Sequence, residues 1–399
     1  MTTTIINKNK KPNVPNLRFP EFQGEWKEGR LADIADLYKG TGISKDQLSD
    51  DGEPCILYGE LYTKYKSETI REVISKTNIN NTKLVKSKAN DVIIPCSGET
   101  AEDIATARCV LNGNILLGGD LNIIRLHGYD GAFMSYQLNG KRKYDIAKVA
   151  QGVSVVHLYG EHLKGVKTIN PCLEEQKKIA SLLALLDERI ATQNKIIEDL
   201  KKLKSAIIEI EYTPNAKTTS HIGDVIEQIS KRNKNNAIQN VLSVSNRQGF
   251  IKQSDQFENR NVASEDTSNY KIVEKNDFAF NPARINVGSI ARLTTLEKGI
   301  VSPMYICFRT QENVAPEYID FFFESKHFYC EIQKRLEGSV RQCLSFEGLC
   351  NIPISLPSLE MQQRIGKRLL TLGQKIKTET DLLELLNKQK QYLLRQMFI

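Results

Sequence analysis

The sequence has no long apolar run and no leader of the secretory type. Its longest strongly apolar stretch, Ala180–Leu186, spans seven residues, whereas a membrane-spanning helix needs about 20. The opening segment Met1–Pro15 carries three lysines but lacks the apolar core and cleavage site of a signal peptide. We therefore expect a chain that stays in the cytoplasm.

The sequence also lacks the residue spacings that carry most catalytic and metal chemistry. Its eight cysteines are scattered without a CxxC pair, and its five histidines form no HExxH pair, so neither a zinc site nor a disulfide framework is expected. No GxxxxGK(S/T) phosphate loop, no GxGxxG after a strand and no GxSxG elbow is present. We expect no catalytic residue, no metal and no cofactor bound by this chain, and a fused methyltransferase or nuclease is disfavoured.

Charge of one sign is not concentrated in any part of the chain. The net charge of +7 divides into +3 for residues 1–170, −1 for 171–212, +1 for 213–356 and +4 for 357–399. No segment is a basic arm of the kind that grips phosphates irrespective of sequence. The overall balance is compatible with nucleic-acid binding but does not argue for it.

What the sequence does contain is a long internal repeat. Pro171–Gln176 (PCLEEQ) recurs as Pro357–Gln362 (PSLEMQ), 186 residues later. Extended without a gap over 42 positions, this offset gives 13 identities, against about three expected by chance. Upstream, the same offset pairs Asn90-Asp91 with Asn276-Asp277. The chain is therefore predicted to be a tandem duplication of one unit, a globular part followed by a helix.

Each repeat ends in a strong helical signal. Apolar residues step by alternating fours and threes over four heptads, which is the a/d seam of a coiled coil. Each segment of about 40 residues follows a proline, has no internal proline and would form a rod of about 60 Å. One polar residue at a matched position in each seam favours pairing of the two helices with each other over two helices that each lie on their own domain. The predicted seam comprises Ile179, Leu183, Leu186, Ile190, Gln193, Ile197, Leu200, Ile365, Leu369, Leu372, Ile376, Glu379, Leu383 and Leu386.

The stretches between the helices are predicted to be mixed. Short β-rich runs such as Asp91–Ile94 and Asn122–Leu126 alternate with polar loops, whereas Glu317–Leu336 has a helical pattern. The predicted fold class is α+β, with two mixed α/β domains in a tandem pseudo-two-fold repeat, separated by two long helices that form an antiparallel coiled coil. The predicted segments are the first domain at 1–170 with a flexible lead at 1–16, the first long helix at 171–212, the second domain at 213–356 and the second long helix at 357–399.

Three polar clusters in the domains contain the residue types that contact base edges and phosphates. Aromatic residues and lysines interleave in Tyr58–Lys66, and polar side chains gather in Ser230–Asn236 and Ser243–Gln248. Taken alone, each cluster is better explained as a solvated loop. No single cluster therefore decides the function.

The duplication, the matched helices and two sequence motifs together resemble the specificity subunit of type I restriction–modification enzymes. One motif is Leu17–Trp26 (LRFPEFQGEW), followed by Leu31–Ile34 (LADI). The other is the junction between Gly152 and Ile179, whose copy ends at Ile365. The resemblance covers essentially the whole chain from residue 17 onward.

The resemblance implies DNA recognition without catalysis. Such subunits have two target-recognition domains, each of which reads one half of a split, asymmetric DNA sequence, and their helices set the spacing between the half-sites. Two methyltransferase subunits, which bind S-adenosylmethionine and methylate adenine at N6, dock around the helices and domains. Two restriction (motor-nuclease) subunits, which use ATP and Mg, complete the restriction enzyme. The chain itself is expected to bind none of these cofactors.

Candidate contacts to double-stranded DNA come from the polar clusters and from neighbouring loops. Lysines are expected to hold phosphates, and Arg, Asn, Gln and Glu to read base edges. In the first domain the candidates are Lys39, Thr41, Ser44, Lys45, Tyr58, Tyr62, Lys64, Tyr65, Lys66, Ser97, Glu99, Thr100, Ser154 and His157. In the second they are Ser230, Lys231, Arg232, Asn233, Lys234, Ser245, Asn246, Arg247, Arg284, Asn286, Ser339, Arg341 and Gln342.

The alternative from another class is a coiled-coil scaffold for proteins, such as an inactive or orphan copy. It predicts the same helices but no sequence-selective DNA binding by the domains.

Overall fold

The computed structural model describes residues 12–79, 83–152, 155–213, 220–246, 248–253, 266–338 and 342–399. The chain divides into two compact units: unit 1 takes residues up to Asn194 together with Asp381–Ile399, and unit 2 takes Lys195–Thr380. The two internal boundaries, after residues 194 and 380, are 186 positions apart, which is the offset of the sequence repeat. Each unit therefore contains one globular domain, the first part of the helix that follows it and the last part of the helix of the other repeat.

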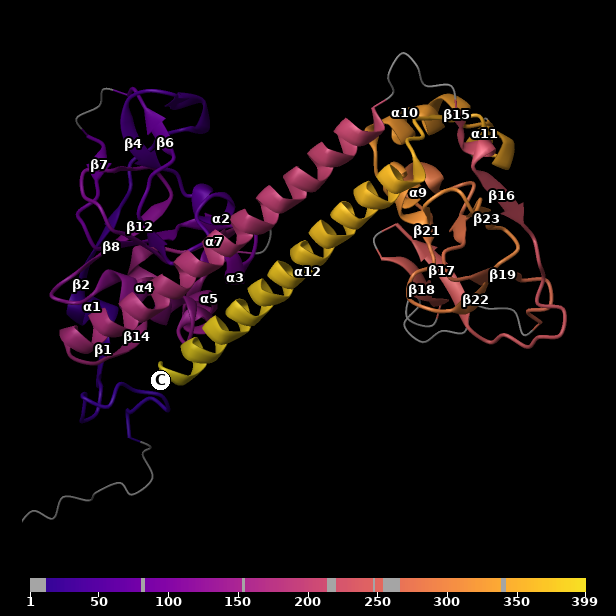
Figure 1. The fold of residues 1–399 in the computed structure, drawn as a ribbon. Coiled ribbons are helices and arrows are strands. Elements are labelled where there is room, and N and C mark those ends of the chain that lie inside the picture. The colour runs from indigo at the N-terminus through magenta and orange to yellow at the C-terminus, as the bar shows by residue number, and fades with distance from the viewer. Residues whose placement is uncertain are drawn as a thin grey trace, which may run out of the picture. The chain divides into compact units, whose positions relative to one another are not determined.

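Unit 1 combines two five-stranded sheets, two strand pairs and short helices (Figure 1). Its strands are β1 Lys27–Arg30, β2 Ala35–Lys39, β3 Leu48–Ser49, β4 Glu53–Ile56, β5 Thr69–Ile70, β6 Ser75–Thr77, β7 Val85–Lys86, β8 Asp91–Pro95, β9 Ser97–Gly98, β10 Arg108–Val110, β11 Leu116–Leu117, β12 Leu121–Leu126, β13 Val156–His157 and β14 Lys167–Asn170. Its helices are α1 Leu31–Ile34, α2 Glu60–Thr63, α3 Ala101–Ile104, α4 Gly131–Asn139, α5 Lys143–Val149 and α6 Gly160–Lys164, with a 3-10 turn at Lys45–Gln47. The sheet orders are β2-β12-β8-β10-β5 and β3-β6-β4-β11-β7, and the pairs are β1-β14 and β9-β13.

Unit 2 has two four-stranded sheets and one strand pair. Its strands are β15 Ser220–His221, β16 Ile226–Ile229, β17 Val241–Ser245, β18 Gly249–Lys252, β19 Lys271–Glu274, β20 Phe278–Phe280, β21 Ile290–Arg292, β22 Lys298–Val301, β23 Ile306–Thr310 and β24 Pro353–Ile354. Its helices are α9 Pro316–Phe322, α10 Lys326–Arg335 and α11 Phe346–Cys350, with 3-10 turns at Ile222–Asp224 and Ile285–Val287. The sheet orders are β16-β23-β20-β21 and β18-β17-β22-β19, and the pair is β15-β24.

The two units repeat one topology. In the first sheets, β2-β12-β8-β10 corresponds to β16-β23-β20-β21, and every neighbouring pair is antiparallel. In the second sheets, β6-β4-β11-β7 corresponds to β18-β17-β22-β19, with one central parallel pair in each. The additional strands β3 and β5 of unit 1 have no counterpart in the described part of unit 2. The predicted tandem repeat of mixed domains is confirmed.

Each first sheet lies between two hydrophobic cores because successive side chains of a strand point to opposite faces. In β8, Val92 and Ile94 join the core on the helix side, whereas Ile93 joins the core shared with the second sheet. In β20, Phe278 joins the helix-side core and Ala279 joins the other. The continuous apolar runs of these strands are explained by burial on both faces.

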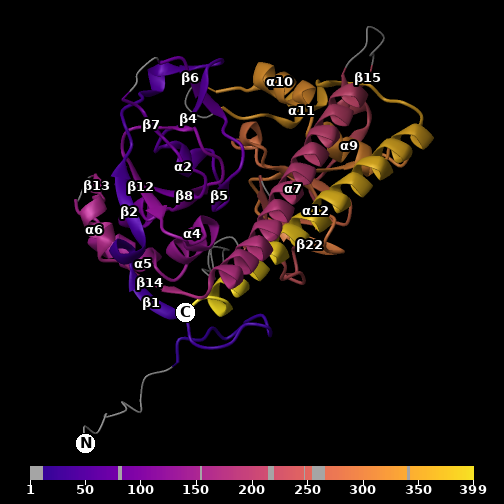
Figure 2. The same ribbon diagram turned by 90° about the vertical axis from the view of Figure 1, so that its left-hand side faces the viewer.

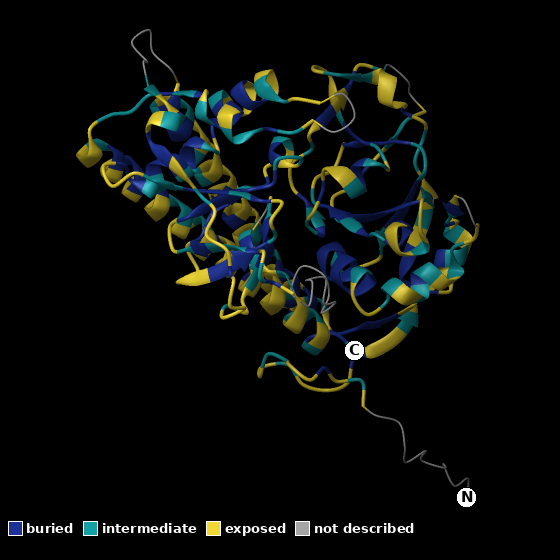
Figure 3. Cartoon of the chain, turned by 90° about the vertical axis from the view of Figure 1, so that its right-hand side faces the viewer, coloured by how far each residue is buried: buried dark blue, intermediate teal, exposed yellow. Residues whose placement is uncertain are grey.

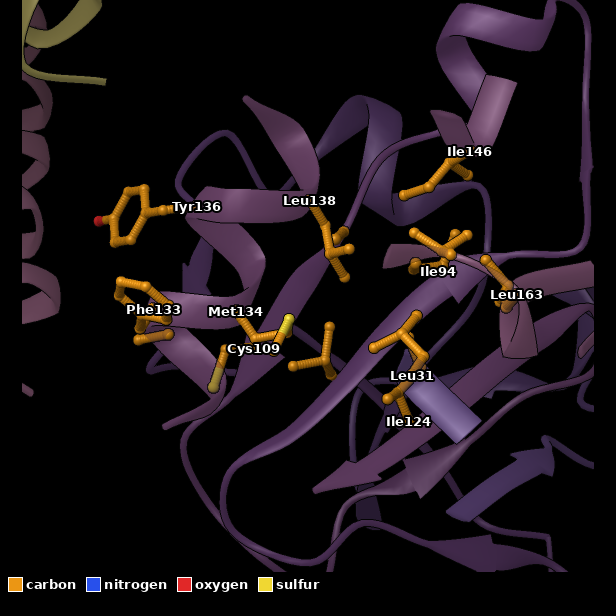
Figure 4. Close-up of a cluster of buried hydrophobic side chains, with 14 of the residues drawn as sticks. Leu31, Ile94, Cys109, Ile124, Phe133, Met134, Tyr136, Leu138, Ile146 and Leu163 are labelled. Atoms are coloured by element: carbon orange, nitrogen blue, oxygen red, sulfur yellow. The ribbon is translucent and has the colours of Figure 1, made fainter. Parts of the chain in front are cut away.

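The helix-side core of unit 1 collects side chains from the first sheet and from α4, α5 and α6. Figure 4 shows Ile94 and Ile124 of the sheet meeting Leu31, while Leu138 and Met134 approach from α4. Coloured by burial, the interior of each unit is occupied by buried residues and the outward faces of the helices by exposed ones (Figure 3).

The segment Glu317–Leu336, predicted to be helical, forms two helices, α9 and α10. Ser325 stands at the N-cap of α10, where its hydroxyl accepts a hydrogen bond from the backbone of Phe328 at 3.1 Å. The same hydroxyl donates to the carbonyl of Phe322, the last residue of α9, at 2.7 Å. A serine that bonds to the backbone in this way ends one helix and begins the next. The helical prediction is confirmed for most of this segment, with a break between Phe322 and Lys326.

A buried glutamine at each junction between domain and long helix explains the repeated PxLExQ motif. The Gln176 side chain accepts from the backbone N–H of Asp130 and donates to the carbonyl of the proline that begins its motif, both at 2.9 Å. Gln362 repeats both bonds, with the backbone N–H of Ala315 at 3.0 Å and its own motif proline at 2.9 Å. Asp130 and Ala315 are the N-caps of α4 and α9. Each glutamine therefore connects the start of a long helix to the start of a helix in the core.

The Leu17–Trp26 motif packs around a buried glutamate of the first long helix. The guanidinium of Arg18 donates to both oxygens of Glu175 at 2.8 Å, and the Trp26 indole donates to the same carboxylate at 3.3 Å. Glu175 is only 1% exposed, and its hydrogen bond raises the pKa of Arg18. The matched residue of the second repeat is Met361, so unit 2 cannot form the same ion pair.

The long helices, α7 Leu173–Tyr212 and α12 Leu359–Gln396, pack against each other inside each unit. In unit 1, Leu183 of α7 shares a core with Phe398, just beyond the end of α12. In unit 2, the last turn of α7 shares a core with Leu369 near the start of α12. The pairing is therefore antiparallel, and both views show the helices side by side (Figures 1 and 2). All the predicted seam residues are buried or half-buried.

A lysine near the end of each long helix bonds to the domain of the other repeat. In unit 1, the Lys390 ammonium lies 2.6 Å from carboxylate oxygens of both Glu68 and Asp187. Burial opposes its charge, but these two carboxylates outweigh that effect and raise the pKa of Lys390. Tyr136, which points away from the other labelled residues in Figure 4, donates to Asp187 at 2.7 Å. In unit 2 the matched lysine, Lys204, holds Glu324 at 2.6 Å.

Replacement of the junction glutamine tests the importance of this connection. Gln362→Ala leaves a buried N–H and a buried carbonyl without their partner, so the free energy of unfolding should fall by about 2 kcal/mol. The shift of the urea midpoint, followed by circular dichroism, measures this change. Gln363→Ala, at the exposed neighbour, is the matched control, and an equal shift in both variants would contradict the assignment.

Candidate nucleic-acid interface

The strands that precede most candidate contacts end at one edge of each first sheet. β2 and β8 flank β12 and are both antiparallel to it, so they run in the same direction and end at the same edge. In unit 2, β16 and β20 flank β23 in the same way. We call the edge formed by the segments after β2 and β8, or after β16 and β20, the loop edge. The candidates that follow these four strands thus lie on corresponding loops.

Three separate segments meet at the loop edge of unit 1. β9 follows β8 and pairs with β13, which places Ser97 opposite His157. The Ser97 hydroxyl lies 3.3 Å from Nδ1 of His157, and the phenol of Tyr62 donates to the Ser97 carbonyl at 3.1 Å. Burial raises the pKa of Tyr62, so its phenol remains a neutral donor. The structure brings Tyr62, Ser97 and His157 together.

Two backbone features at this place recur in unit 2, although the strand pair β9–β13 has no counterpart in the described part of that unit. The chain entering α6 or α11 bonds back to the segment after β8 or β20, and a β-bridge closes the preceding loop in each repeat. The matched bonds are Leu158 N–H to Cys96 O at 2.8 Å and Leu344 N–H to Pro282 O at 3.0 Å, and the matched bridges are Gln151–His157 and Glu337–Cys343. Each residue of one repeat is 186 positions from its partner in the other.

The segment after β16 forms a basic groove. This open groove of about 820 Å³ is lined by Ser230–Asn235 together with Ile272 and Lys298. A backbone bond of 2.8 Å from Ile272 to the carbonyl of Lys231 fixes the segment along β19. The groove therefore gathers cations from the predicted Ser230–Asn236 cluster and one from a distant strand.

Most of the candidate side chains are accessible to solvent. Those exposed are Lys39, Ser44, Lys45, Tyr58, Lys64, Lys66, Glu99, Thr100, Ser230, Lys231, Arg232, Lys234, Asn246, Arg284 and Gln342. Those half-buried are Thr41, Tyr62, Ser97, His157, Ser245 and Asn286. Ser154, Arg247, Ser339 and Arg341 lie outside the described residues. DNA contact by any of these residues stays a prediction.

Two candidates, Tyr65 and Asn233, are buried. Tyr65 is 7% exposed, and its phenol accepts from the backbone of Ile74 at 3.2 Å. Asn233 is 2% exposed and bonds to the backbone N–H and carbonyl of Ile238. Both side chains hold neighbouring loops in place, and little of either residue is exposed.

Neither a metal centre nor a membrane span is found in the part of the chain that the structure describes. There, no group of three or more His, Cys, Asp or Glu side chains is placed to hold a metal ion. No described helix combines the length and the apolar character needed to cross a membrane.

Comparison with known proteins identifies the family. The sequence matches the family described as "Type I restriction modification DNA specificity domain" twice, over residues 23–202 and 214–388. The chain belongs to this family of type I DNA specificity proteins. It is a specificity subunit, a non-catalytic component of a type I restriction–modification system with two tandem DNA specificity domains. This role involves assembly with other subunits and with DNA, and the comparisons do not favour the scaffold alternative.

Similar proteins cover nearly the whole specificity subunit. The MjaVIII specificity subunit of a type I restriction enzyme of Methanocaldococcus jannaschii is 25% identical, over 94% of this chain and 90% of that protein. A crystal structure of the type I S subunit from M. genitalium has a TM-score of 0.63 at 17% identity, covering 97% of this chain and 99% of the other. A chain from a structural study of the assembly and conformational transition of the type I restriction–modification system has a TM-score of 0.51 at 15% identity, covering 94% and 97%. These structures share the fold.

Sequence reasoning missed three residues that the fold places beside the candidates. Lys298 reaches the basic groove because β22 pairs with β19. Tyr159 and Lys164 line a smaller pocket of about 250 Å³ with Lys39 and Cys96. Burial raises the pKa of Cys96 to about 11, so its thiol is neutral and unreactive. None of the three lies in a polar cluster of the sequence, so a search for such clusters could not find them.

Replacement of Lys298, one of the cations that line the basic groove, tests whether the second specificity domain contacts phosphates there. Lys298→Ala should weaken binding to all DNA sequences alike and lower the slope of log K against log salt by about one. Fluorescence anisotropy with a specific and a scrambled duplex over a series of salt concentrations measures both quantities. Lys326→Ala, which removes the same charge from an exposed position at the start of α10, is the control. An equal loss in this control would exclude a local contact.

Proposed function

We propose that each specificity domain reads one half of a bipartite, asymmetric DNA sequence through its loop edge. The observation that carries this proposal is one scaffold with two different sets of loops. The segments after β2 and β16 follow corresponding strands, yet one is Gly40–Gln47 (GTGISKDQ) and the other Ser230–Ala237 (SKRNKNNA). Two equal scaffolds with unlike side chains suit two different half-sites, because base edges are read by side chains.

The placement of charge supports DNA as the ligand. Lys231, Arg232, Lys234 and Lys298 line one groove, and Lys39 and Lys164 line the smaller pocket of the first domain. Lysine and arginine at the surface neutralise phosphates, and this term dominates affinity for DNA. Neutral side chains of the same groove, such as Ser230, would supply base contacts.

The helix pair is proposed to be the spacer between the half-sites and the docking platform for the partner subunits. Inside unit 1, an apolar groove of about 650 Å³ lies between the helices and is lined by Leu182, Leu186, Leu386 and Leu393. Leu185 beside it is 62% exposed. Exposed apolar surface of this kind is typical of a protein interface. We infer that two methyltransferase subunits bind around the helices and domains, and that two restriction subunits complete the enzyme.

The partner subunits would supply the cofactors. S-adenosylmethionine belongs to the methyltransferase subunits, which transfer its methyl group to adenine N6, and ATP with Mg belongs to the restriction subunits. The specificity subunit contributes only the choice of sequence. The complex would act in the cytoplasm, where it has access to cellular and incoming DNA.

Genome-wide methylation provides the direct test. The chain is co-expressed with its methyltransferase subunit in a host without adenine methylation, and N6-methyladenine is mapped. An asymmetric motif interrupted by a fixed gap is expected. Complex formation without methylation would favour the scaffold alternative, and an uninterrupted motif produced by the partner alone would contradict a role in choosing the site.

Two substitutions should separate base reading from phosphate contact. Arg284→Ala, at an exposed position of the second domain, should relax one base pair of one half-site, a loss of about 1–3 kcal/mol of discrimination. Lys45→Ala, at an exposed position of the first domain, should weaken binding uniformly and leave the motif unchanged. Binding to a randomised duplex library measures both, and an unchanged preference in Arg284→Ala would contradict its assignment.

A further inference from the structure

His157 of the first domain is held in a defined orientation at the loop edge. Its Nδ1 lies 3.3 Å from the Ser97 hydroxyl, and Ser97 is itself fixed by the phenol of Tyr62 at 3.1 Å. Both members of the pair are half-buried, so the pair remains accessible from solvent. Because Nδ1 is engaged by serine, a ligand would meet the other ring nitrogen, Nε2.

Tyr159 packs beside this pair, and its position at the start of α6 leaves that helix without a side-chain cap. Its ring stacks on His157 with centroids 6.2 Å apart and an interplanar angle of 22°, and the side chain is 52% exposed. Tyr159 occupies the N-cap of α6 and makes no capping hydrogen bond. The matched N-cap of α11 is Ser345, whose hydroxyl accepts from the backbone of Gly348 at 3.0 Å. A residue that caps the helix is therefore present at this position in the second domain and absent in the first.

The matched positions of the second domain carry different side chains beside a shared β-bridge, although the β9–β13 pair has no counterpart in the described part of unit 2. The 186-residue offset places Ala283 at the position of Ser97 and Cys343 at that of His157. The β-bridge that closes the loop is present in both repeats. The β-bridge therefore forms without a serine–histidine pair, so closure of this loop does not by itself explain the pair.

We propose that His157, oriented by Ser97 and stacked on Tyr159, is a specificity-determining residue that reads a purine in the half-site of the first domain. In this proposal the serine hydroxyl donates to Nδ1, so the proton of the neutral imidazole is on Nε2, which is then a donor. N7 is an acceptor that both purines present in the major groove. The second domain lacks this donor and reads its half-site without it. This inference rests on the proposed function.

Transfer of the second domain's residues into the first tests the assignment. The full chain carrying Ser97→Ala and His157→Cys is co-expressed with the methyltransferase subunit, and the methylation motif is compared with that of the unaltered chain. Discrimination at one purine position of one half-site should fall about tenfold, and the other half-site should not change. An unchanged motif would overturn the inference. If the unaltered chain gives no interrupted motif, the proposed function fails instead.

Tyr159→Ser separates recognition from stability. It restores the capping residue of the second domain, so the thermal midpoint should not fall, while the same purine position relaxes. A lower midpoint with an unchanged motif would show that Tyr159 is structural and would overturn its part in the proposal. His127→Cys is the control, because His127 follows β12 and lies beside the start of β2, at the opposite edge of the sheet. Relaxation of the same purine position in this control would also contradict the assignment.

Discussion

Each globular core is closed by an aromatic residue from the end of the other repeat's helix, and the rest of the structure depends on this exchange. Phe398 is 3% exposed and stacks on Phe133 at 5.1 Å in unit 1. Tyr212, 186 positions earlier, is 1% exposed and packs on Tyr318 at 4.7 Å in unit 2. Because neither core is complete without the other repeat's helix, the helices must run antiparallel, and the junction glutamines acquire their partners together with Lys390 and Lys204. One duplicated sequence thereby encodes two mutually dependent units.

The scaffold also neutralises much of its charge internally. The asparagine–aspartate pair repeated at 90–91 and 276–277 places each asparagine at a positive φ, 79° and 72°. The aspartate that follows is buried and ion-paired with an arginine of the neighbouring strand, Arg125 at 2.8 Å or Arg309 at 3.0 Å. Net charge therefore says little about the surface. These ion pairs remove equal charge of each sign, and a nearly neutral domain presents a basic groove where its cations gather, as Lys231, Arg232, Lys234 and Lys298 do.

The sequence predicts those features that repeat at short range or at a constant offset. The apolar periodicity of the helices and the junction motif are of this kind, and they lead to the correct architecture and family. The candidate loops were chosen by composition, which does not report burial, so Tyr65 and Asn233 were included although their side chains lie in the interior. Lys298 was overlooked because only strand pairing brings it to Lys231, 67 positions earlier. Neither composition nor periodicity shows which distant segments of the chain pair as strands.

The division of the units has a consequence for folding during synthesis. The residues that complete unit 1, Asp381–Ile399, are translated after the whole of unit 2. At about 5–20 residues per second, the ribosome needs on the order of 10–40 s to make the intervening segment. During that interval the core around Phe133 lacks Phe398, and the carboxylates of Glu68 and Asp187 lack Lys390. The domain that leaves the ribosome first is therefore the one that is finished last.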